Sequence, residues 1–220
     1  MHDYGDDIFT EQPDVDPDTL ANLGPLRRMA GVWEGTKGFD VNPYIGGPRR
    51  QVYVERLELQ PCDPQSNGPQ LLYGLRYHVS IQKPGEVDTY HDQVGYWLWE
   101  PATGTILHSL TIPRGQVVLA KGQASADAAS FEVSARRGST EAGICSQAFL
   151  EDAFRTEAFT MRVTFHDDGT WSYEEDTLLA VKGAAEAFHH TDRNRLTRIA
   201  APTPNPMARA AQAEAAPVED

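Results

Sequence analysis

The sequence predicts an all-β fold, a ten-stranded antiparallel β-barrel with a short N-terminal helical lid and disordered termini. Strand-like segments recur about every 10–14 residues between residues 31 and 199, separated by turn sequences rich in glycine, proline, asparagine and aspartate. Helical spacing of apolar residues is confined to residues 20–30. Because a sheet of ten strands tends to curl and close, we expect a barrel with an internal cavity, and a β-sandwich is the alternative.

The predicted strands are defined by alternating apolar residues and by the turns between them. Alternate residues are apolar from Leu71 to Ile81 and again from Phe159 to Phe165. Asp167-Asp168-Gly169 is a strong hairpin signal. The ten predicted ranges are 31–39, 50–60, 70–82, 87–99, 104–112, 116–124, 129–136, 155–165, 170–181 and 191–199. Together they predict a single barrel.

The start of the barrel is marked by Leu23-Gly24-Pro25-Leu26, followed by Gly31-Val32-Trp33-Glu34-Gly35. Glycine allows the first strand to bend sharply at the barrel floor. Trp33 is expected to plug the closed end, and it is a candidate contact for a cofactor. Arg198 or Arg195 can stack on its indole as a cation–π pair that contributes about 1 kcal/mol. Small ligand-carrying barrels of the lipocalin and fatty-acid-binding type tend to begin in this way, so the fold is expected to be calycin-like.

Charge is unevenly distributed along the chain. The formal net charge is −13, and residues 1–20 hold seven acidic residues and no Lys or Arg. We expect a disordered acidic leader at 1–20, a ligand-binding barrel at 21–199 and a disordered Ala/Pro-rich tail at 200–220. The acidic barrel offers no electrostatic footprint for nucleic acid. No apolar run approaches the roughly 20 residues of a membrane span, and the N-terminus lacks a secretory signal, so a cytoplasmic location is expected.

Other polar groups give weaker signals. Cys62 and Cys145 are widely separated and form no C-x-x-C pair, so a zinc or redox motif is unsupported and both are expected to be free thiols. In the carboxylate run Glu174-Glu175-Asp176, the first and third residues share one strand face. We expect that face to be a solvated outer wall.

Two histidines precede the last predicted strand, in Phe188-His189-His190. Neutral imidazole is a good axial ligand for heme iron, and one protein ligand suffices if an apolar cavity holds the macrocycle. Adjacent residues on a strand point to opposite faces, so at most one of the two can reach the cavity. The alternative is a histidine pair on the surface or the rim.

A further candidate is His91, which shares one face of its predicted strand with Gln93, Trp97 and Trp99. If this face is inward, His91 is a distal hydrogen-bond donor beside a bound ligand. If it is outward, His91 pairs with a carboxylate. The sequence leaves both directions open.

With these motifs in this order, residues 23–199 resemble the nitrobindins, heme-binding β-barrels related in shape to fatty-acid-binding proteins. The matching features are Leu-Gly-Pro-Leu, Gly-x-Trp-x-Gly, His91-x-x-x-Gly95-Tyr96 and the histidine-rich entry to Leu196-x-Arg198. The resemblance implies that ferric heme b binds through His190, with His189 as the fallback, and that His91 lies near the heme. Some nitrobindins are described as peroxynitrite isomerases, so a reaction with peroxynitrite or nitric oxide at the iron is implied.

The sequence departs from the nitrobindin pattern in two places. Lys37 occupies a position that is usually glycine, and Pro43-Tyr44 comes later and in reversed order, so we expect a different pocket mouth. The spacing from His190 to Leu196-x-Arg198 is one residue longer than usual. Because a one-residue change inverts strand parity, either a bulge absorbs it or neither histidine faces the cavity.

Two hypotheses about function follow. One is a heme-binding barrel that isomerises peroxynitrite. The other is a non-enzymatic carrier of a small apolar ligand, with the same fold and no iron. A third possibility, a partner-binding module that uses the acidic leader, rests on composition alone. The sequence leaves a monomer and a homodimer open.

Overall fold

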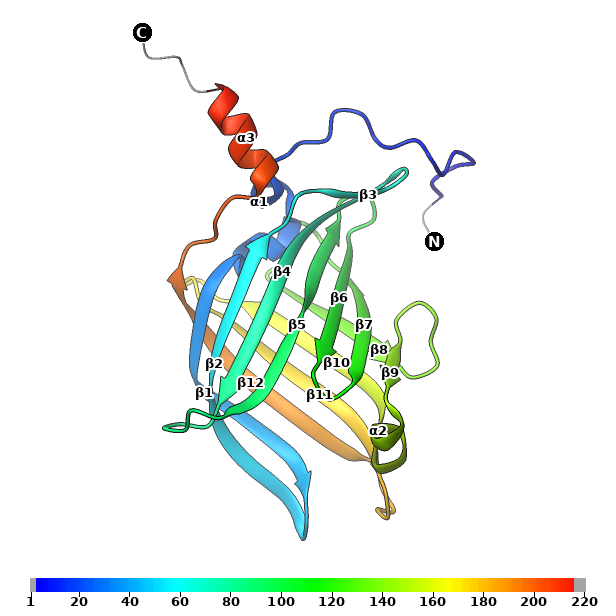
Figure 1. Ribbon diagram of the computed structural model, residues 1–220, viewed down its shortest axis with the longest axis vertical. Coiled ribbons are helices and arrows are strands. Elements are labelled where there is room, and N and C mark those ends of the chain that lie inside the picture. The colour runs from blue at the N-terminus through cyan, green and yellow to red at the C-terminus, as the bar shows by residue number, and fades with distance from the viewer. Residues whose placement is uncertain (1–2, 216–220) are drawn as a thin grey trace.

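The computed structural model describes residues 3–215, and its ten long strands form a closed antiparallel barrel (Figure 1). These strands are β1 (Gly31–Tyr44), β2 (Gly47–Pro61), β4 (Gln70–Gln82), β5 (Thr89–Glu100), β6 (Thr105–Ile112), β7 (Gln116–Gln123), β8 (Ser130–Arg136), β10 (Phe154–Phe165), β11 (Trp171–Val181) and β12 (Phe188–Ala200). They pair in the order β2-β1-β12-β11-β10-β8-β7-β6-β5-β4, and β4 returns to β2. The predicted ten-stranded barrel is confirmed, and the sandwich alternative is wrong.

Three-residue strands extend the sheet at two points. β3 (Gln65–Asn67) pairs with β4, and β9 (Ile144–Ser146) pairs with β7. The β1–β2 hairpin is longer than predicted and projects beyond the barrel wall (Figure 1). Its turn is Ile45-Gly46, and Gly46 and the following Gly47 have φ angles of 86° and 129°, which suit glycine.

The N-terminal segment closes one end of the barrel. Helix α1 (Thr19–Asn22) is capped by Asp18, which accepts a hydrogen bond from the Ala21 amide. The 3₁₀ helix η1 (Gly24–Met29) follows, and Leu23, Leu26 and Met29 are fully buried. The predicted helical lid is confirmed at the closed end.

Trp33 is the plug at this end. Its indole Nε1 donates to the Met29 carbonyl at 2.6 Å, and its ring meets Trp171 edge-on at 5.9 Å. The Arg198 guanidinium lies 4.6 Å from the centre of the indole. The predicted cation–π partner is therefore Arg198, whereas Arg195 faces outward and pairs with Asp168 at 2.7 Å.

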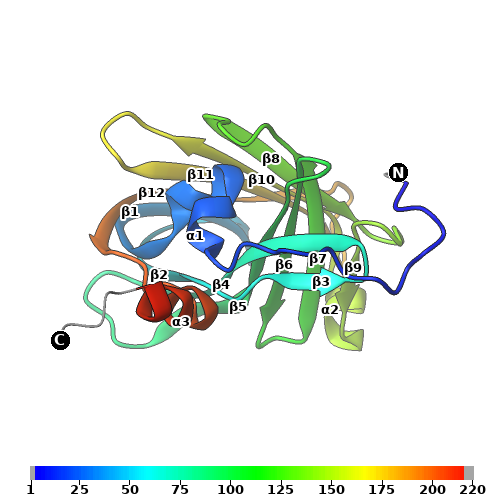
Figure 2. The same ribbon diagram turned by 90° about the horizontal axis from the view of Figure 1, so that it is seen from above.

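The sequence predicts a disordered tail at 200–220, but part of this segment is helical. Helix α3 (Pro206–Ala215) forms there, because proline suits the first helical position and alanine favours helix. The N-terminal residues 3–18 contain no helix or strand, but Gln12 donates to the Pro69 carbonyl at 2.7 Å. Seen from above, this segment runs over β3, and α3 lies near α1 (Figure 2). The outermost tail residues, 216–220, and residues 1–2 lie outside the described residues.

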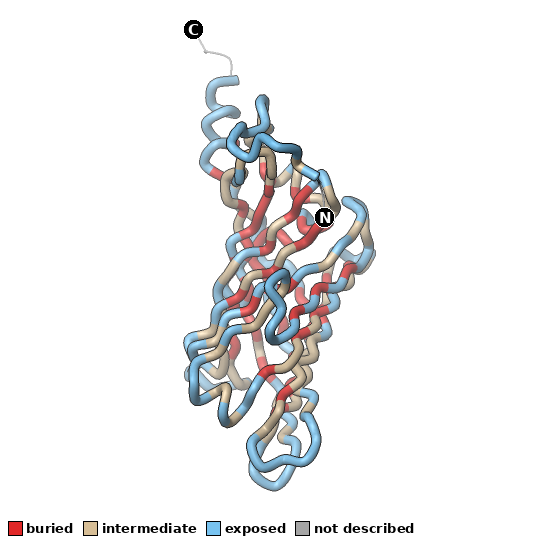
Figure 3. The backbone as a smooth tube through the Cα atoms, turned by 90° about the vertical axis from the view of Figure 1, so that its right-hand side faces the viewer, coloured by how far each residue is buried: buried red, intermediate tan, exposed pale blue. Residues whose placement is uncertain are grey.

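Burial alternates along the strands, as expected for a barrel with one solvated face (Figure 3). In β8, for example, Phe131, Val133 and Ala135 are buried while their neighbours are exposed. Among residues 3–215, no helix has the length and apolar character needed to cross a membrane. A short helix, α2 (Ala148–Ala153), lies at the end opposite α1 (Figure 1).

Candidate functional site

The barrel encloses a cavity of about 520 Å³. Its lining includes Phe149 and Leu150 of α2, so the cavity reaches the end of the barrel opposite the lid. The apolar part of the wall comes from both halves of the sheet and includes Leu57, Val79, Leu110, Val118, Phe159 and Met161. Such a volume and lining are typical of a small-molecule or cofactor site.

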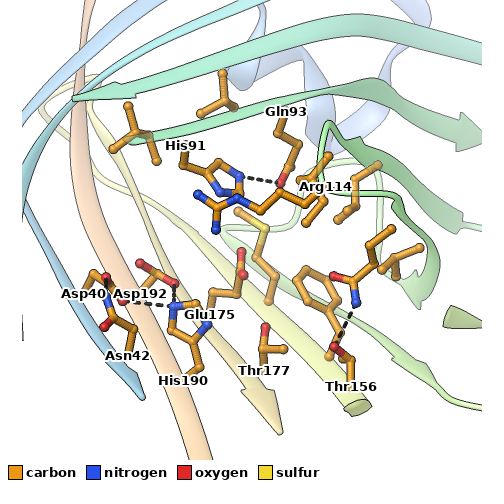
Figure 4. A pocket seen from close by; sticks show the side chains of 18 of the residues that line it. Asp40, Asn42, His91, Gln93, Arg114, Thr156, Glu175, Thr177, His190 and Asp192 are labelled. Carbon is orange, nitrogen blue, oxygen red and sulfur yellow. Dashed lines mark hydrogen bonds and ion pairs between the residues drawn. The ribbon is translucent and has the colours of Figure 1, made fainter. Parts of the chain in front are cut away.

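His190 of β12 lies in the cavity lining, whereas His189 faces outward. The His190 Nε2 atom is 2.9 Å from Asp40 Oδ1 and 3.3 Å from Asp192 Oδ2 (Figure 4). The His189 side chain is 65% exposed, and its Nδ1 atom pairs with Asp176 Oδ2 at 2.7 Å. Alternation along the strand separates the two neighbours as predicted. His190 is therefore the histidine that can reach a cavity ligand.

The direction of His190 corrects one expectation from the sequence. β12 pairs with β11 without a register shift from Phe188 to Leu196. His190 and Leu196 are an even number of residues apart, so they share the inward face. Of the two alternatives drawn from the sequence, a bulge or two outward histidines, the second is wrong, and β12 itself keeps its register with β11. The bulge lies instead on β1, between Gly35 and Gly38.

Asp40 of β1 is almost completely buried, and its carboxylate is held at both oxygens. Oδ1 faces His190, and Oδ2 accepts hydrogen bonds from Asn42 and Tyr90. Burial raises the pKa of Asp40, but the hydrogen bonds from His190, Tyr90 and Asn42 together hold that pKa below its ordinary value. For His190, burial lowers the pKa, but the neighbouring Asp40 and Asp192 raise it above the usual value. Both shifts favour the ionised forms of the two side chains.

Two further carboxyl groups lie beside this pair. Asp192 and Glu175 both line the cavity, and Figure 4 shows them beside His190. Burial and the neighbouring Glu175 raise the pKa of Asp192 well above its ordinary range. Burial and the more distant Glu55 raise the pKa of Glu175 as well. This corner of the cavity therefore carries more acidic groups than cationic ones.

A polar cluster lies deeper on the same wall. The Glu55 Oε2 atom accepts hydrogen bonds from Tyr173 and from Asn194, both at 2.9 Å, and the Tyr53 and Tyr173 hydroxyls are 2.8 Å apart. Glu55 is 5% exposed. Burial raises its pKa to about 7, although both hydrogen bonds oppose the rise. Glu55 is thus a carboxyl group poised between its two protonation states near neutral pH.

His91 faces inward, on the wall opposite His190 (Figure 4). Its Nε2 atom is 3.3 Å from Gln93 Oε1, and the Gln93 amide donates to the Tyr77 hydroxyl at 2.7 Å. That hydroxyl is 2.9 Å from Nε2 of His108, whose ring stacks on Trp97 at 3.8 Å. Burial lowers the pKa of His91, and burial lowers that of His108 to about 3. Both imidazoles are therefore neutral at physiological pH.

Trp171 lines the cavity, and Trp33 lies behind it and is not part of the lining. Asp40, Glu55 and Asp192 line the cavity but were not predicted from the sequence. In the carboxylate run of β11, Glu175 faces the cavity, whereas Glu174 and Asp176 on either side of it face outward. A charged residue within an inward, otherwise apolar alternation is the signal that would have revealed Glu55, because Tyr53 and Leu57 flank it on the same face.

The residues present fit a heme group in composition. The cavity offers the imidazole of His190 and apolar walls. The guanidinium groups of Arg49 and Arg114 also line it and can pair with the carboxylates of heme. His190 Nε2, the usual iron-binding atom, faces Asp40. Ligation through that atom requires the imidazole to exchange its carboxylate partners for the metal.

Comparison with known proteins agrees with this composition. The family model described as THAP4-like, heme-binding beta-barrel domain matches residues 22–198. No curated protein matches the chain. The crystal structure of Rv2717c from M. tuberculosis is similar, with a TM-score of 0.55 and 19% identity over 84% of this chain and 99% of that one, which indicates a shared fold. The nitrobindin-like fold inferred from the sequence is confirmed, and this chain belongs to the family of THAP4-like heme-binding β-barrel domains.

Proposed function

We propose that this chain binds heme b through His190 and that the ferric heme reacts with peroxynitrite or nitric oxide. The observation that carries the proposal is His190 itself, an imidazole that reaches an apolar barrel cavity in a member of a heme-binding family. When bound, heme would supply a Lewis-acidic ferric iron.

The chain's own residues have separable roles in this proposal. Asp40 and Asp192 hold Nε2 of His190 in the heme-free protein, and they would release this atom to the iron when heme binds. Leu110, Phe159 and the other apolar side chains exclude water from the macrocycle. His91, kept neutral by burial, can exchange a hydrogen bond with a molecule bound on its side of the cavity.

Heme reconstitution tests the proposal. The unmutated protein is expected to take up heme stoichiometrically and to show a Soret band. His190→Ala should lose this band, whereas His189→Ala should keep it, because His189 faces outward. A protein without a Soret band, or a His190→Ala variant that retains an unchanged one, contradicts the proposal.

The chemical part of the proposal has its own test. Stopped-flow decay of peroxynitrite, with nitrate measured as product, should be faster with the ferric holoprotein than with the His190→Ala variant. Equal rates would leave heme binding intact and refute the isomerase activity.

The second candidate is a carrier of a small apolar ligand. The interaction of His190 Nε2 with Asp40 favours it, because this imidazole already has a partner without iron. Native mass spectrometry of the purified protein should then show a co-purified apolar molecule. Stoichiometric heme and no such molecule would exclude the carrier.

A further inference from the structure

One corner of the cavity gathers metal-ligating atoms from two adjacent strands. Asp40 projects from β1, and His190 and Asp192 project from β12. One ligand atom from each of these three side chains lies within 4.8 Å of the other two. The two strands pair directly, with Asp40 opposite Asp192, so sheet register fixes the spacing. We call these three residues the His190 triad.

The carboxyl groups around the His190 triad outnumber its cationic partners. Glu175 adds a third carboxyl group from β11, where it pairs with Asp192 across the sheet and faces the same space (Figure 4). Within residues 3–215, the ion pairs of Asp40 and Asp192 are with His190 alone, and Glu175 takes part in none. One imidazole thus faces three carboxyl groups in a partly desolvated wall, where uncompensated charge is costly.

We propose that the His190 triad binds a divalent first-row transition-metal ion, of the Mn²⁺, Fe²⁺ or Zn²⁺ class, in the heme-free protein. Two carboxylates and one imidazole are ligands that these ions accept, and three ligands on one side leave coordination positions for water or a cavity ligand. The ion supplies the positive charge that the surrounding carboxyl groups lack.

Hydrogen bonds around Asp40 hold its carboxylate in place for a metal ion. The Asp40 oxygen turned away from His190 accepts hydrogen bonds from Asn42 and Tyr90, which fix the plane of the carboxylate. Partners of this kind orient the ligands in metal sites, and their loss typically weakens metal affinity about 10- to 100-fold. Tyr90 and Asn42 also bond to each other, so the support is cooperative.

The inference goes beyond the proposed function and does not rest on it. A cation and a heme iron would compete for one imidazole, His190, but they depend on different neighbours. Asp192 is a ligand of the cation, whereas heme binding needs no carboxylate at that position. The two proposals can therefore succeed or fail separately.

Titration of the heme-free full chain with Co²⁺, followed by visible d–d absorption, tests the inference. We expect one Co²⁺ per chain, displaced by Zn²⁺. Asp192→Asn and His190→Ala should each weaken Co²⁺ binding at least about 100-fold, given that even the loss of an orienting partner costs 10- to 100-fold. The outward pair offers matched controls one strand position away, and His189→Ala and Asp176→Asn should bind Co²⁺ normally.

Heme uptake by the same variants separates the two proposals. Asp192→Asn should lose Co²⁺ and keep the Soret band. Absence of Co²⁺ absorption in the unmutated chain overturns the inference, as does equal Co²⁺ affinity in Asp192→Asn. If that variant fails to fold by circular dichroism, pulsed EPR of the Mn²⁺-loaded unmutated chain decides. Modulation from one imidazole nitrogen supports the inference, and its absence overturns it.

Discussion

Glu55 is a buried, hydrogen-bonded carboxyl group whose pKa lies near neutral pH. It lies on the inward face of β2 between Tyr53 and Leu57, and Tyr173 and Asn194 both donate to its Oε2 atom. These donors favour the carboxylate, but desolvation outweighs them and raises the pKa to about 7 from an ordinary 4.5. The folded protein therefore holds this proton to a higher pH than the unfolded chain does.

We predict that Glu55 makes the protein less stable as pH rises. The contribution of its proton is complete below pH 4.5 and is lost as pH increases through about 7. Glu55→Gln keeps an acceptor for both donors and cannot ionise, so it should raise the free energy of unfolding at pH 8 by about 1–3 kcal/mol relative to the unmutated chain. Urea unfolding at pH 5 and pH 8 measures this difference. The exposed Glu58→Gln is the control, and a Glu55→Gln variant that is less stable at pH 8 would contradict the prediction.

Two histidines of the site could be predicted from the sequence as candidates, whereas Asp40 and Asp192 could not. His190 and His91 stand in a recognisable order of motifs, and imidazole suggests a ligand wherever a cavity is expected. Asp40 and Asp192 are separated by about 150 residues, and nothing local marks them. They meet only because β1 pairs with β12 in one register.

The first strand illustrates how an element makes room for this site. β1 is bulged between Gly35 and Gly38, and each glycine accommodates a side chain of the polar wall. A Cβ atom at Gly38 would lie 2.1 Å from the Tyr53 ring, and one at Gly35 would lie 2.2 Å from the Asn194 amide. The glycine-rich start of β1 thus leaves room for Tyr53 and Asn194, which belong to the polar cluster around Glu55.

We predict that Gly38→Ala destabilises the barrel. The Tyr53 ring is fully buried and hydrogen-bonded to Tyr173, so it cannot move aside freely. Overpacking of this kind costs about 1–3 kcal/mol. The shift of the urea midpoint measures the loss, with the exposed neighbour Lys37→Ala as control. Equal midpoints for the two variants would show that the ring has room to yield.

The strands were predictable because alternation and turn residues are local signals. Eight of the ten predicted starts fall within two residues of those observed, and β2 and β12 each begin three residues early, at Gly47 and Phe188. Helix α3 was missed because its Ala-rich sequence has no apolar stripe, and only Ala208 is buried in it. Its position is set by long-range contacts of the preceding residue, Asn205, which no local pattern shows.

At the scale of the whole molecule, the segment before the lid and the segment before α3 meet at the closed end of the barrel. Asn205 is 1% exposed and connects three segments. Its amide donates to the Pro17 carbonyl and to Asp63, both at 2.8 Å, and its oxygen accepts from the Thr19 amide at 3.2 Å. The lid is thereby tied to the tail and to the loop after β2, far from the His190 corner.

This arrangement predicts that the tail stabilises the lid without affecting the cavity. Asn205→Ala leaves buried polar partners such as the Thr19 amide without hydrogen bonds, which should cost about 2 kcal/mol and lower the Tm by roughly 4–8 °C. The exposed Arg209→Ala on α3 is the matched control. Hydrogen exchange should accelerate in residues 17–30, where the ties are lost, and ligand uptake at the opposite end should not change. A variant with the Tm of the control would show that η1 and Trp33 close the barrel unaided, whereas a parallel loss of ligand uptake would show that the two ends are coupled through the barrel.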